Sequence, residues 1–178
     1  SFSKKRDLNK SLICGLVGGL FPDLDILIKS KNDPLLFLEY HRHFTHSLFF
    51  VPVGGLIVSG ILYFLFFRNN TSFKKIYLFS SLGILTHGLL DACTSYGTSL
   101  YWPVSDQRVS WSVISIIDPC YTLILILSLC FCVKLKSKIS AQIGLFISVL
   151  YLIMGFFKHN LVLEFVENLS SERGHRIE

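Results

Sequence analysis

The chain has 178 residues, of which 51% are hydrophobic and only 16% charged, and its mean hydropathy is +0.54. A soluble domain carries about 25% charged residues, so this composition excludes an ordinary soluble protein. The formal net charge of +5 comes from short basic clusters between apolar runs. Such clusters set the orientation of membrane helices. We therefore expect an integral membrane protein that contacts membrane lipids and binds no nucleic acid directly.

Apolar segments follow one another along the chain, and a membrane-crossing helix needs about 20 apolar residues. The apolar segment 12–21 is only ten residues long and is followed directly by Asp23 and Asp25. It therefore either crosses the membrane with these acids near one surface or enters the membrane and returns. The clearer spans are 48–67, 76–91, 112–133 and 139–157. We expect an all-α, integral membrane helical bundle with about four to five membrane segments, forming one domain over residues 1–178. Apolar residues at helical spacing predict an amphipathic tail at 158–178.

Ionisable residues gather where the predicted topology brings distant loops together. The spans 48–67 and 76–91 carry the chain across and back, so the loops 29–47 and 92–111 lie on one face. Ionisable groups at membrane depth are costly, and proteins keep them where they pair, line a cavity or bind something. The groups at this face are Asp23 and Asp25, His41, His43 and His46 with Glu39 and Arg42, the pair His87 and Asp91, and Asp118.

These residue types predict a metal site. Imidazole nitrogen and carboxylate oxygen are ligands that zinc accepts, so we expect one or two Zn²⁺ ions, with another divalent metal as the alternative. His87 and Asp91 are four residues apart, share one helix face and can hold one cation or simply form a hydrogen bond. The expected ligands are Asp25, His46, His87 and Asp91 first, and Asp23, His41 and His43 next.

Three further residues are candidates for catalysis. Arg42 is expected to bind a phosphate through two hydrogen bonds, while Asp118 and Glu39 are expected to act as a general base or to orient metal ligands. Each group also has a purely structural explanation. An acid beside a proline can cap a helix, a histidine loop can be solvated, and an arginine can reach the lipid headgroups. Such caps have no reason to collect on one face, which favours a shared site.

Several motifs in this chain resemble the YdjM-type family of bacterial inner-membrane metal-dependent hydrolases, described as LexA-binding or LexA-regulated. They are F-P-D-L-D at 21–25, L-E-Y-H-R-H-F-T-H-S at 38–47, T-H-G-L-L-D-A-C-T-S-Y-G-T at 86–98, W-P-V-S at 102–105 and S-I-I-D-P at 115–119. The resemblance implies kinship with zinc-dependent phospholipase C and P1-type nucleases, hence a similar helical core. Those enzymes cleave phosphoesters with histidine and aspartate ligands, and His87-x-x-x-Asp91 matches one of their patterns.

The expected function is that of a membrane-bound, zinc-dependent hydrolase acting on a phosphoester or a lipid-linked, amphiphilic substrate. Two alternatives stay open: a transporter or ion-conducting protein, and a non-catalytic adaptor that binds a regulator such as LexA. The chain lacks the D-x-x-T-H opening of the family and ends soon after S-x-x-G-H, so we expect a piece shortened at both ends.

The expected location is the bacterial inner membrane, crossed several times. If the segment 12–21 crosses, ten of the 17 basic residues lie on the face opposite the motifs, and the site is extracytoplasmic. A re-entrant first segment would reverse this assignment.

Overall fold

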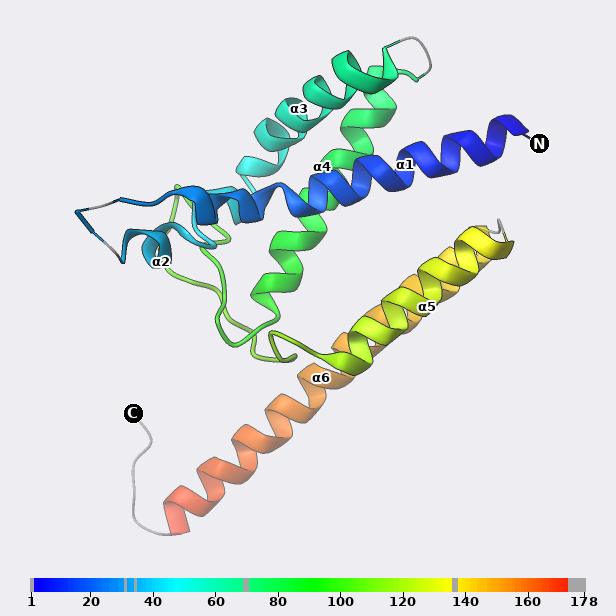
Figure 1. Ribbon diagram of the computed structural model, residues 1–178. Helices are drawn as coiled ribbons and strands as arrows, with labels where there is room; N and C mark the ends of the chain where they lie inside the picture. Colours follow the sequence, from blue (N-terminus) through cyan, green and yellow to red (C-terminus); the bar gives the residue numbers. More distant parts are fainter. Residues whose placement is uncertain (1, 31, 34, 69–70, 136–137, 173–178) are drawn as a thin grey trace. The chain divides into compact units, whose positions relative to one another are not determined.

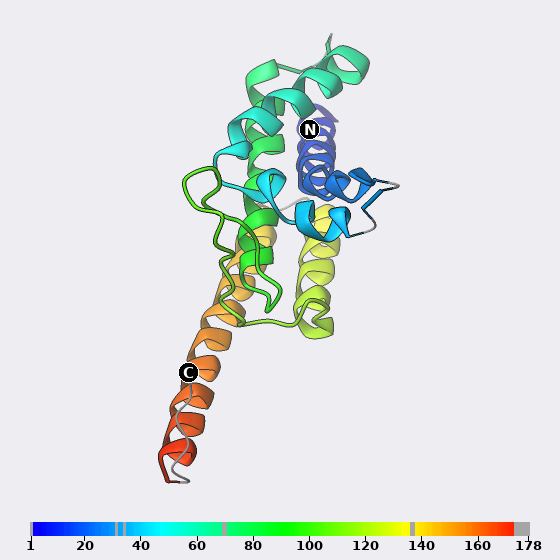
Figure 2. The same ribbon diagram turned by 90° about the vertical axis from the view of Figure 1, so that its left-hand side faces the viewer.

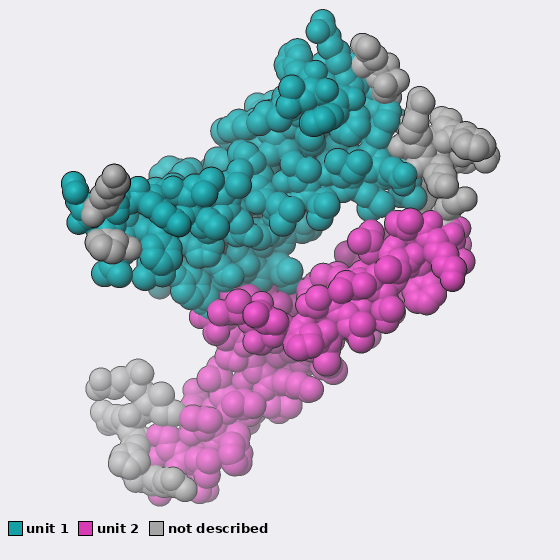
Figure 3. Space-filling view, viewed as in Figure 1, with its two compact units in different colours: residues 1–92, 96–110 teal, residues 93–95, 111–178 magenta. Residues whose placement is uncertain are grey.

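The computed structural model describes residues 2–30, 32–33, 35–68, 71–135 and 138–172. Within these ranges every named element is helical, and extended segments form only isolated bridges. The expectation of an all-α fold is therefore confirmed. The chain divides into a first unit, residues 1–92 with 96–110, and a second unit, residues 93–95 with 111–178 (Figure 3). A single domain over the whole chain stays a prediction.

The first unit is built on three long helices joined by short helical turns. In chain order its elements are α1 (Phe2–Leu20), the 3₁₀ turn η1 (Pro22–Leu27), α2 (Leu36–Tyr40), the 3₁₀ turn η2 (Phe44–His46), α3 (Phe50–Leu62), the π-helical η3 (Tyr63–Phe67) and α4 (Phe73–Ala92). Pro22 stands at the start of η1. A proline has no N–H to donate and fits only the first turn of a helix, so Pro22 helps to end α1 and begin the next turn.

The helices α1 and α4 run in the same direction, whereas α3 runs antiparallel to α4 (Figure 1). Lys10 Nζ donates a hydrogen bond to Thr71 Oγ1 at 2.8 Å, just before α4 begins. Further along, Gly18 of α1 lies against Ser80 of α4. The first unit therefore has two ends: one near the start of α4, and one where α4 finishes beside η1 and η2 (Figure 2).

Small residues let α1 and α4 approach very closely. A Cβ atom added at Gly18 would overlap the backbone of Ser80, and one added at Gly83 would overlap the backbone of Gly15 and Gly19. Close backbone approach through small residues is typical of helix pairs in membranes, where apolar side chains gain little from leaving lipid for protein. This contact fixes the end of α1, and therefore η1, beside the second half of α4.

The buried core of the first unit lies between these three helices. Its members are Cys14 from α1, Val58, Leu62 and Phe67 from α3 and η3, and Ile76 and Ile84 from α4. Each helix thus contributes at least one buried side chain to the same cluster. Gly55 brings α3 close to α4, since a Cβ at this position would overlap the hydroxyl of Ser81.

The second unit consists of α5 (Pro119–Leu135) and the long α6 (Lys138–Glu172), which pack side by side (Figure 1). Gly144 of α6 lies directly against Ser128 of α5. An extended segment precedes α5: the Cys93 carbonyl accepts hydrogen bonds from the N–H groups of Val113 and Ile114, at 2.9 and 3.1 Å. The predicted tail is the last part of α6, and its residues 173–178 lie outside the described ranges.

Two helical stretches in the described ranges are long and apolar enough to cross a membrane, Phe50–Phe67 and Ile139–Glu172. This is fewer than the four to five spans expected from the sequence. The expected span 112–133 is shorter because its helix begins only at Pro119, leaving 17 residues. The helix α4 has 20 residues, but lysines near its start and His87 and Asp91 near its end lower its hydropathy.

The contact between α1 and α4 gives a direct test of this packing. We expect Gly83→Ala to lower the free energy of unfolding by about 1–3 kcal/mol, because the added methyl group meets backbone atoms that have no rotamer to change. Gly60→Ala is the matched control, since an added Cβ there has nothing within 4 Å. It should leave stability unchanged or raise it by up to about 1 kcal/mol. Thermal unfolding in detergent measures both, and equal melting temperatures would contradict the packing described.

Candidate metal centre

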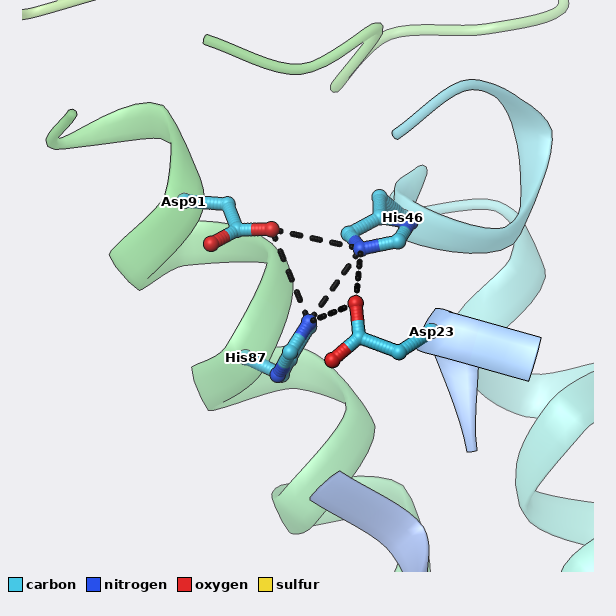
Figure 4. A group of neighbouring side chains, drawn as sticks. All are labelled: Asp23, His46, His87 and Asp91. Atoms are coloured by element: carbon cyan, nitrogen blue, oxygen red, sulfur yellow. Dashed lines mark hydrogen bonds and ion pairs between the residues drawn. The ribbon is translucent and has the colours of Figure 1, made fainter. Parts of the chain in front are cut away.

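Four side chains converge at one end of the first unit: Asp23 from η1, His46 from η2, and His87 and Asp91 from α4 (Figure 4). One ligand atom from each residue lies within 4.8 Å of the other three ligand atoms. We call these residues the four-residue group. They are up to 68 positions apart in the sequence, so the three-helix packing and the two 3₁₀ turns bring them together.

The distances within the four-residue group fit a small tetrahedral cation. His46 Nε2 lies 3.1 Å from His87 Nε2, 3.2 Å from Asp91 Oδ2 and 3.5 Å from Asp23 Oδ1. His87 Nε2 lies 3.3 Å from Asp23 Oδ1 and 3.5 Å from Asp91 Oδ2. Zinc bonds of about 2.0–2.2 Å in a tetrahedron place neighbouring donor atoms about 3.3–3.6 Å apart. Five of the six donor pairs therefore stand at nearly the spacing that zinc requires, and the two carboxylate oxygens lie within 4.8 Å of each other.

A hydrogen-bond chain behind His46 fixes which nitrogen faces the group. Thr45 Oγ1 donates to Asp25 Oδ2 at 2.7 Å, and the same hydroxyl oxygen lies 3.0 Å from His46 Nδ1. Because the hydroxyl proton is directed to the carboxylate, its oxygen accepts a proton from Nδ1. His46 Nε2 is then the atom that can bind a metal, in the arrangement typical of carboxylate–histidine–metal sites.

Asp25 is the centre of this supporting network. It is buried, 2% exposed, and its Oδ2 also accepts the backbone N–H of Arg42 at 3.0 Å. Its other oxygen lies 2.8 Å from His41 Nδ1. A buried carboxylate with three such partners is well satisfied. Asp25 therefore ties η1 to the histidine loop.

Two backbone features bring the histidine loop onto α4. A Cβ at Gly88 would lie 2.6 Å from the carbonyl oxygen of His46, so only glycine permits this approach without a shift. Arg42 has a φ of +61°, the left-handed region that costs a non-glycine residue energy. Its Nε lies 3.3 Å from Asp91 Oδ2, and its guanidinium lies over the ring of Tyr96 at 5.1 Å. Arg42 therefore contacts a member of the four-residue group directly.

The electrostatics of the group favour a cation. Burial lowers the pKa of His46, but hydrogen bonds to Asp23, Asp25 and Asp91 outweigh burial and raise it to about 10. Hydrogen bonds from His46 and His87 hold the pKa of Asp23 far below its usual range. Burial raises the pKa of Asp25, but hydrogen bonds from His46, His41 and Thr45 outweigh it and lower the value to about 2. The ionised carboxylates thus favour positive charge at this position, which is either the proton on His46 or a metal ion that displaces it.

Comparison with known proteins supplies the family. The family described as "YdjM inner membrane protein" matches residues 1–162, most of the chain. The chain belongs to this family. Its members are thus inner membrane proteins, in agreement with the two apolar helices described above.

Two curated relatives of this YdjM-family chain show how much of a longer protein it covers. It is 32% identical over 108 residues to "Uncharacterized protein YfhP" of Bacillus subtilis, covering 61% of this chain and 32% of YfhP. It is also 32% identical over 111 residues to "Inner membrane protein YbcI" of Escherichia coli, covering 59% of this chain and 61% of YbcI. The match therefore spans less than two thirds of either relative. No solved structure matches the chain, so a core like that of phospholipase C or P1 nuclease stays a prediction.

Six of the seven sequence-predicted metal ligands of this family member fall into two layers. Asp23, His46, His87 and Asp91 form the four-residue group. Asp25 and His41 lie behind it, bonded to each other and supporting His46. His43 packs against the ring of Trp102, with its Nε2 at 3.9 Å from Asp106 Oδ1.

The three predicted catalytic residues have different surroundings. Arg42 contacts Asp91, as described above. Glu39 lies in α2 with an exposed side chain. Asp118 belongs to the second unit, where its Oδ1 accepts the N–H of Tyr121 at 2.9 Å and its carboxylate accepts the hydroxyl of Tyr151. Asp118 thus caps the start of α5.

Sequence reasoning missed Thr45, Gly88, Tyr96 and Arg108. Thr45 directly precedes His46, and Gly88 directly follows His87. Their positions next to predicted metal ligands are the sequence feature that could have identified them as part of the site. Arg108 donates to the carbonyl oxygen of His41 at 2.9 Å and lies over Tyr96 at 5.0 Å. No local pattern connects Arg108 to the histidine loop, because the contact spans 67 positions.

Asp25 provides the test of the supporting network. Asp25→Asn replaces one carboxylate oxygen, which accepts hydrogen bonds, by an NH₂ group that would face buried hydrogen-bond donors. We therefore expect the free energy of unfolding to fall by about 1–3 kcal/mol. Zinc affinity should fall about 10–100-fold, since partners that orient a ligand typically have this effect. Asp33→Asn is the control, because Asp33 is exposed and its bond to the N–H of Leu35 survives the change. Calorimetric zinc titration checks both, and equal affinities would contradict the role given to Asp25.

Proposed function

We propose that this chain is a membrane-bound metal-dependent hydrolase whose zinc ion is held by Asp23, His46, His87 and Asp91. One observation supports this most: four donor atoms from three separate elements lie within 4.8 Å of one another, and each histidine Nε2 lies 3.1–3.5 Å from the other three donor atoms. Structural side chains that merely cap helices have no reason to meet in this way. The carboxylate–threonine–histidine chain behind His46 adds support, because it leaves Nε2 as the donor.

With four protein ligands, zinc could activate water only by taking it as a fifth ligand; it would then lower the pKa of that water to about 7 and polarise a phosphoryl or acyl oxygen. A catalytic site also needs an open side. The side chain of Asp23 is 44% exposed and that of His87 is 22% exposed, whereas the side chain of His46 is fully buried. Substrate would therefore approach past Asp23. Arg42 adds a positive charge beside Asp91, which suits a substrate that carries a phosphate.

The surroundings of the group favour an amphiphilic, lipid-linked phosphoester as substrate. Leu24 and Leu27 of η1 flank Asp23 and are 53% and 70% exposed. In the adjoining α2, Phe37 and Leu38 are also exposed. Exposed apolar side chains around a polar site fit a membrane interface, where they contact lipid tails. A substrate held in the bilayer could then present its headgroup to the metal.

The helix directions in the first unit support an extracytoplasmic site in a protein that crosses the membrane several times. Because α1 and α4 run the same way, α1 covers the same depth as α4. This favours the first of the two topologies considered from the sequence, in which Lys10, Lys74 and Lys75 of the first unit lie on the side opposite the four-residue group. Positive residues favour the cytoplasmic side. Transport, and binding of a regulator such as LexA, stay predictions.

Metal content is the first test. We expect purified protein to carry about one zinc ion per chain, and the His87→Ala and Asp91→Asn variants to lose it, since each removes one of four ligands. His159→Ala is the matched control, because His159 lies in the second unit and not in the four-residue group. Elemental analysis after removal of loosely bound metal measures all four proteins. Zinc retained by both ligand variants would refute the assignment.

Hydrolysis is the second test. Vesicle-reconstituted protein should cleave a phosphodiester probe or a phospholipid, lose this activity on chelation and regain it with zinc. The Asp91→Asn variant should stay inactive after zinc is added, because it lacks a ligand, while the His159→Ala control should respond like the original chain. Stoichiometric zinc without hydrolysis of lipid or soluble phosphoesters would leave a metal-binding protein and contradict the proposed activity.

A further inference from the structure

A pocket of about 320 Å³ lies at the end of the first unit opposite the four-residue group, between the starts of the paired regions of α1 and α4. Lys10, Thr71 and Lys75 supply its polar rim, and Cys14, Ile76 and Phe79 are among its apolar walls. We propose that this pocket binds the phosphate headgroup of an anionic phospholipid. The site differs from the proposed metal centre and does not depend on it.

Charge supports this occupant. Two lysines face the pocket, and none of the described side chains that line it is acidic. Lys10 Nζ donates to Thr71 Oγ1 and lies 5.8 Å from the ring centroid of Phe67. These contacts hold the ammonium group at the rim. A hydroxyl and two lysines lining one small pocket suit a phosphate ester, and basic pockets between membrane helices are known to bind anionic lipid headgroups.

The apolar surface beside the pocket accounts for the rest of a lipid. Leu78 lines the pocket and is 54% exposed, and Leu82, one turn further along α4, is 44% exposed. On α1, Ile13 and Val17 are also exposed. The two helices run in the same direction, so these side chains continue from the pocket along both helices. The acyl chain of a phospholipid can lie along this apolar surface while its headgroup contacts the lysines. A free phosphate has no acyl chain and could not use the apolar surface.

The distance along α4 separates this pocket from the four-residue group. Lys75 and Asp91 are 16 residues apart on one helix, which corresponds to about 24 Å. That length approaches the hydrocarbon thickness of about 30 Å. The pocket and the four-residue group therefore face opposite membrane surfaces, and the lipid bound here is a structural or orienting ligand and not the substrate.

Lipid binding can be measured on the purified full chain by native mass spectrometry, with phosphatidylglycerol, phosphatidylcholine and soluble glycerol phosphate as probes. We expect phosphatidylglycerol to bind in preference to the other two. Lys10→Ala/Lys75→Ala should weaken phosphatidylglycerol binding roughly 30-fold, because each lysine near an anionic lipid surface contributes on the order of a fivefold change in affinity. Lys74→Ala is the matched control, since Lys74 adjoins Lys75 on α4 but does not line the pocket.

A charge-preserving variant guards against a simple folding defect. Lys10→Arg/Lys75→Arg should retain the preference for phosphatidylglycerol, and zinc content should be unchanged in all variants. Equal binding of phosphatidylglycerol and phosphatidylcholine by the original chain would overturn the proposal. Retention of the preference in the double alanine variant, or its loss in the Lys74→Ala control, would do the same. Glycerol phosphate binding as tightly as the lipid would show a soluble anion site and exclude the lipid as occupant.

Discussion

The close contact between α1 and α4 is the constraint on which the candidate site depends. Gly18 and Gly83 let the two backbones approach to a distance that excludes any side chain. Because the helices run in the same direction, the end of α1 lies beside the second half of α4. Pro22 then starts η1 there, which carries Asp23 to within 3.3 Å of His87. Without the glycine contact, an acid from the first segment would have no fixed position relative to the histidine on α4.

Burial of Asp25 completes what the helix contact begins. A carboxylate that is 2% exposed must satisfy its oxygens within the protein, and Asp25 does so with Thr45, His41 and the N–H of Arg42. Leaving such a group unsatisfied costs more than a single hydrogen bond contributes, so the histidine loop can adopt few other arrangements. The same loop then presents His46 to α4 at Gly88. The spacing of the four-residue group is thus a consequence of how the chain satisfies the hydrogen bonds of a buried carboxylate.

Part of this arrangement can be read from the sequence, because helical spacing is local. The four-residue separation of His87 and Asp91 predicts that they share a face, and α4 has them 3.5 Å apart. The choice between Asp23 and Asp25 cannot be read in this way. A 3₁₀ turn has three residues per turn, so residues two apart point in different directions, and only the fold decides which acid meets the histidines.

The expected number of membrane spans shows a second limit. The sequence of residues 112–118 is apolar enough to continue the helix α5 towards the N-terminus. These residues are nevertheless not helical, because the Cys93 carbonyl accepts hydrogen bonds from the N–H groups of Val113 and Ile114. That pairing joins positions about 20 residues apart, and hydropathy alone carries no sign of it. Asp118 then becomes a helix cap at the boundary between extended and helical chain. Composition therefore identifies the membrane protein and its all-α class, but non-local hydrogen bonds decide where α5 begins.

The two ends of the first unit carry different sets of ionisable groups, and this difference connects the candidate metal centre with the lysine pocket. Carboxylates and imidazoles converge where α4 ends, whereas Lys10, Lys74 and Lys75 lie where it begins. Lysines favour the cytoplasmic side and attract anionic headgroups, so in the proposed lipid complex they would hold this end of the unit at the membrane surface. Asp23 and Asp91 lie at the other end of the unit, away from the anionic headgroups that would repel their carboxylates. A single helix pair can in this way fix both the orientation of the protein and the side of the membrane on which a cation is bound.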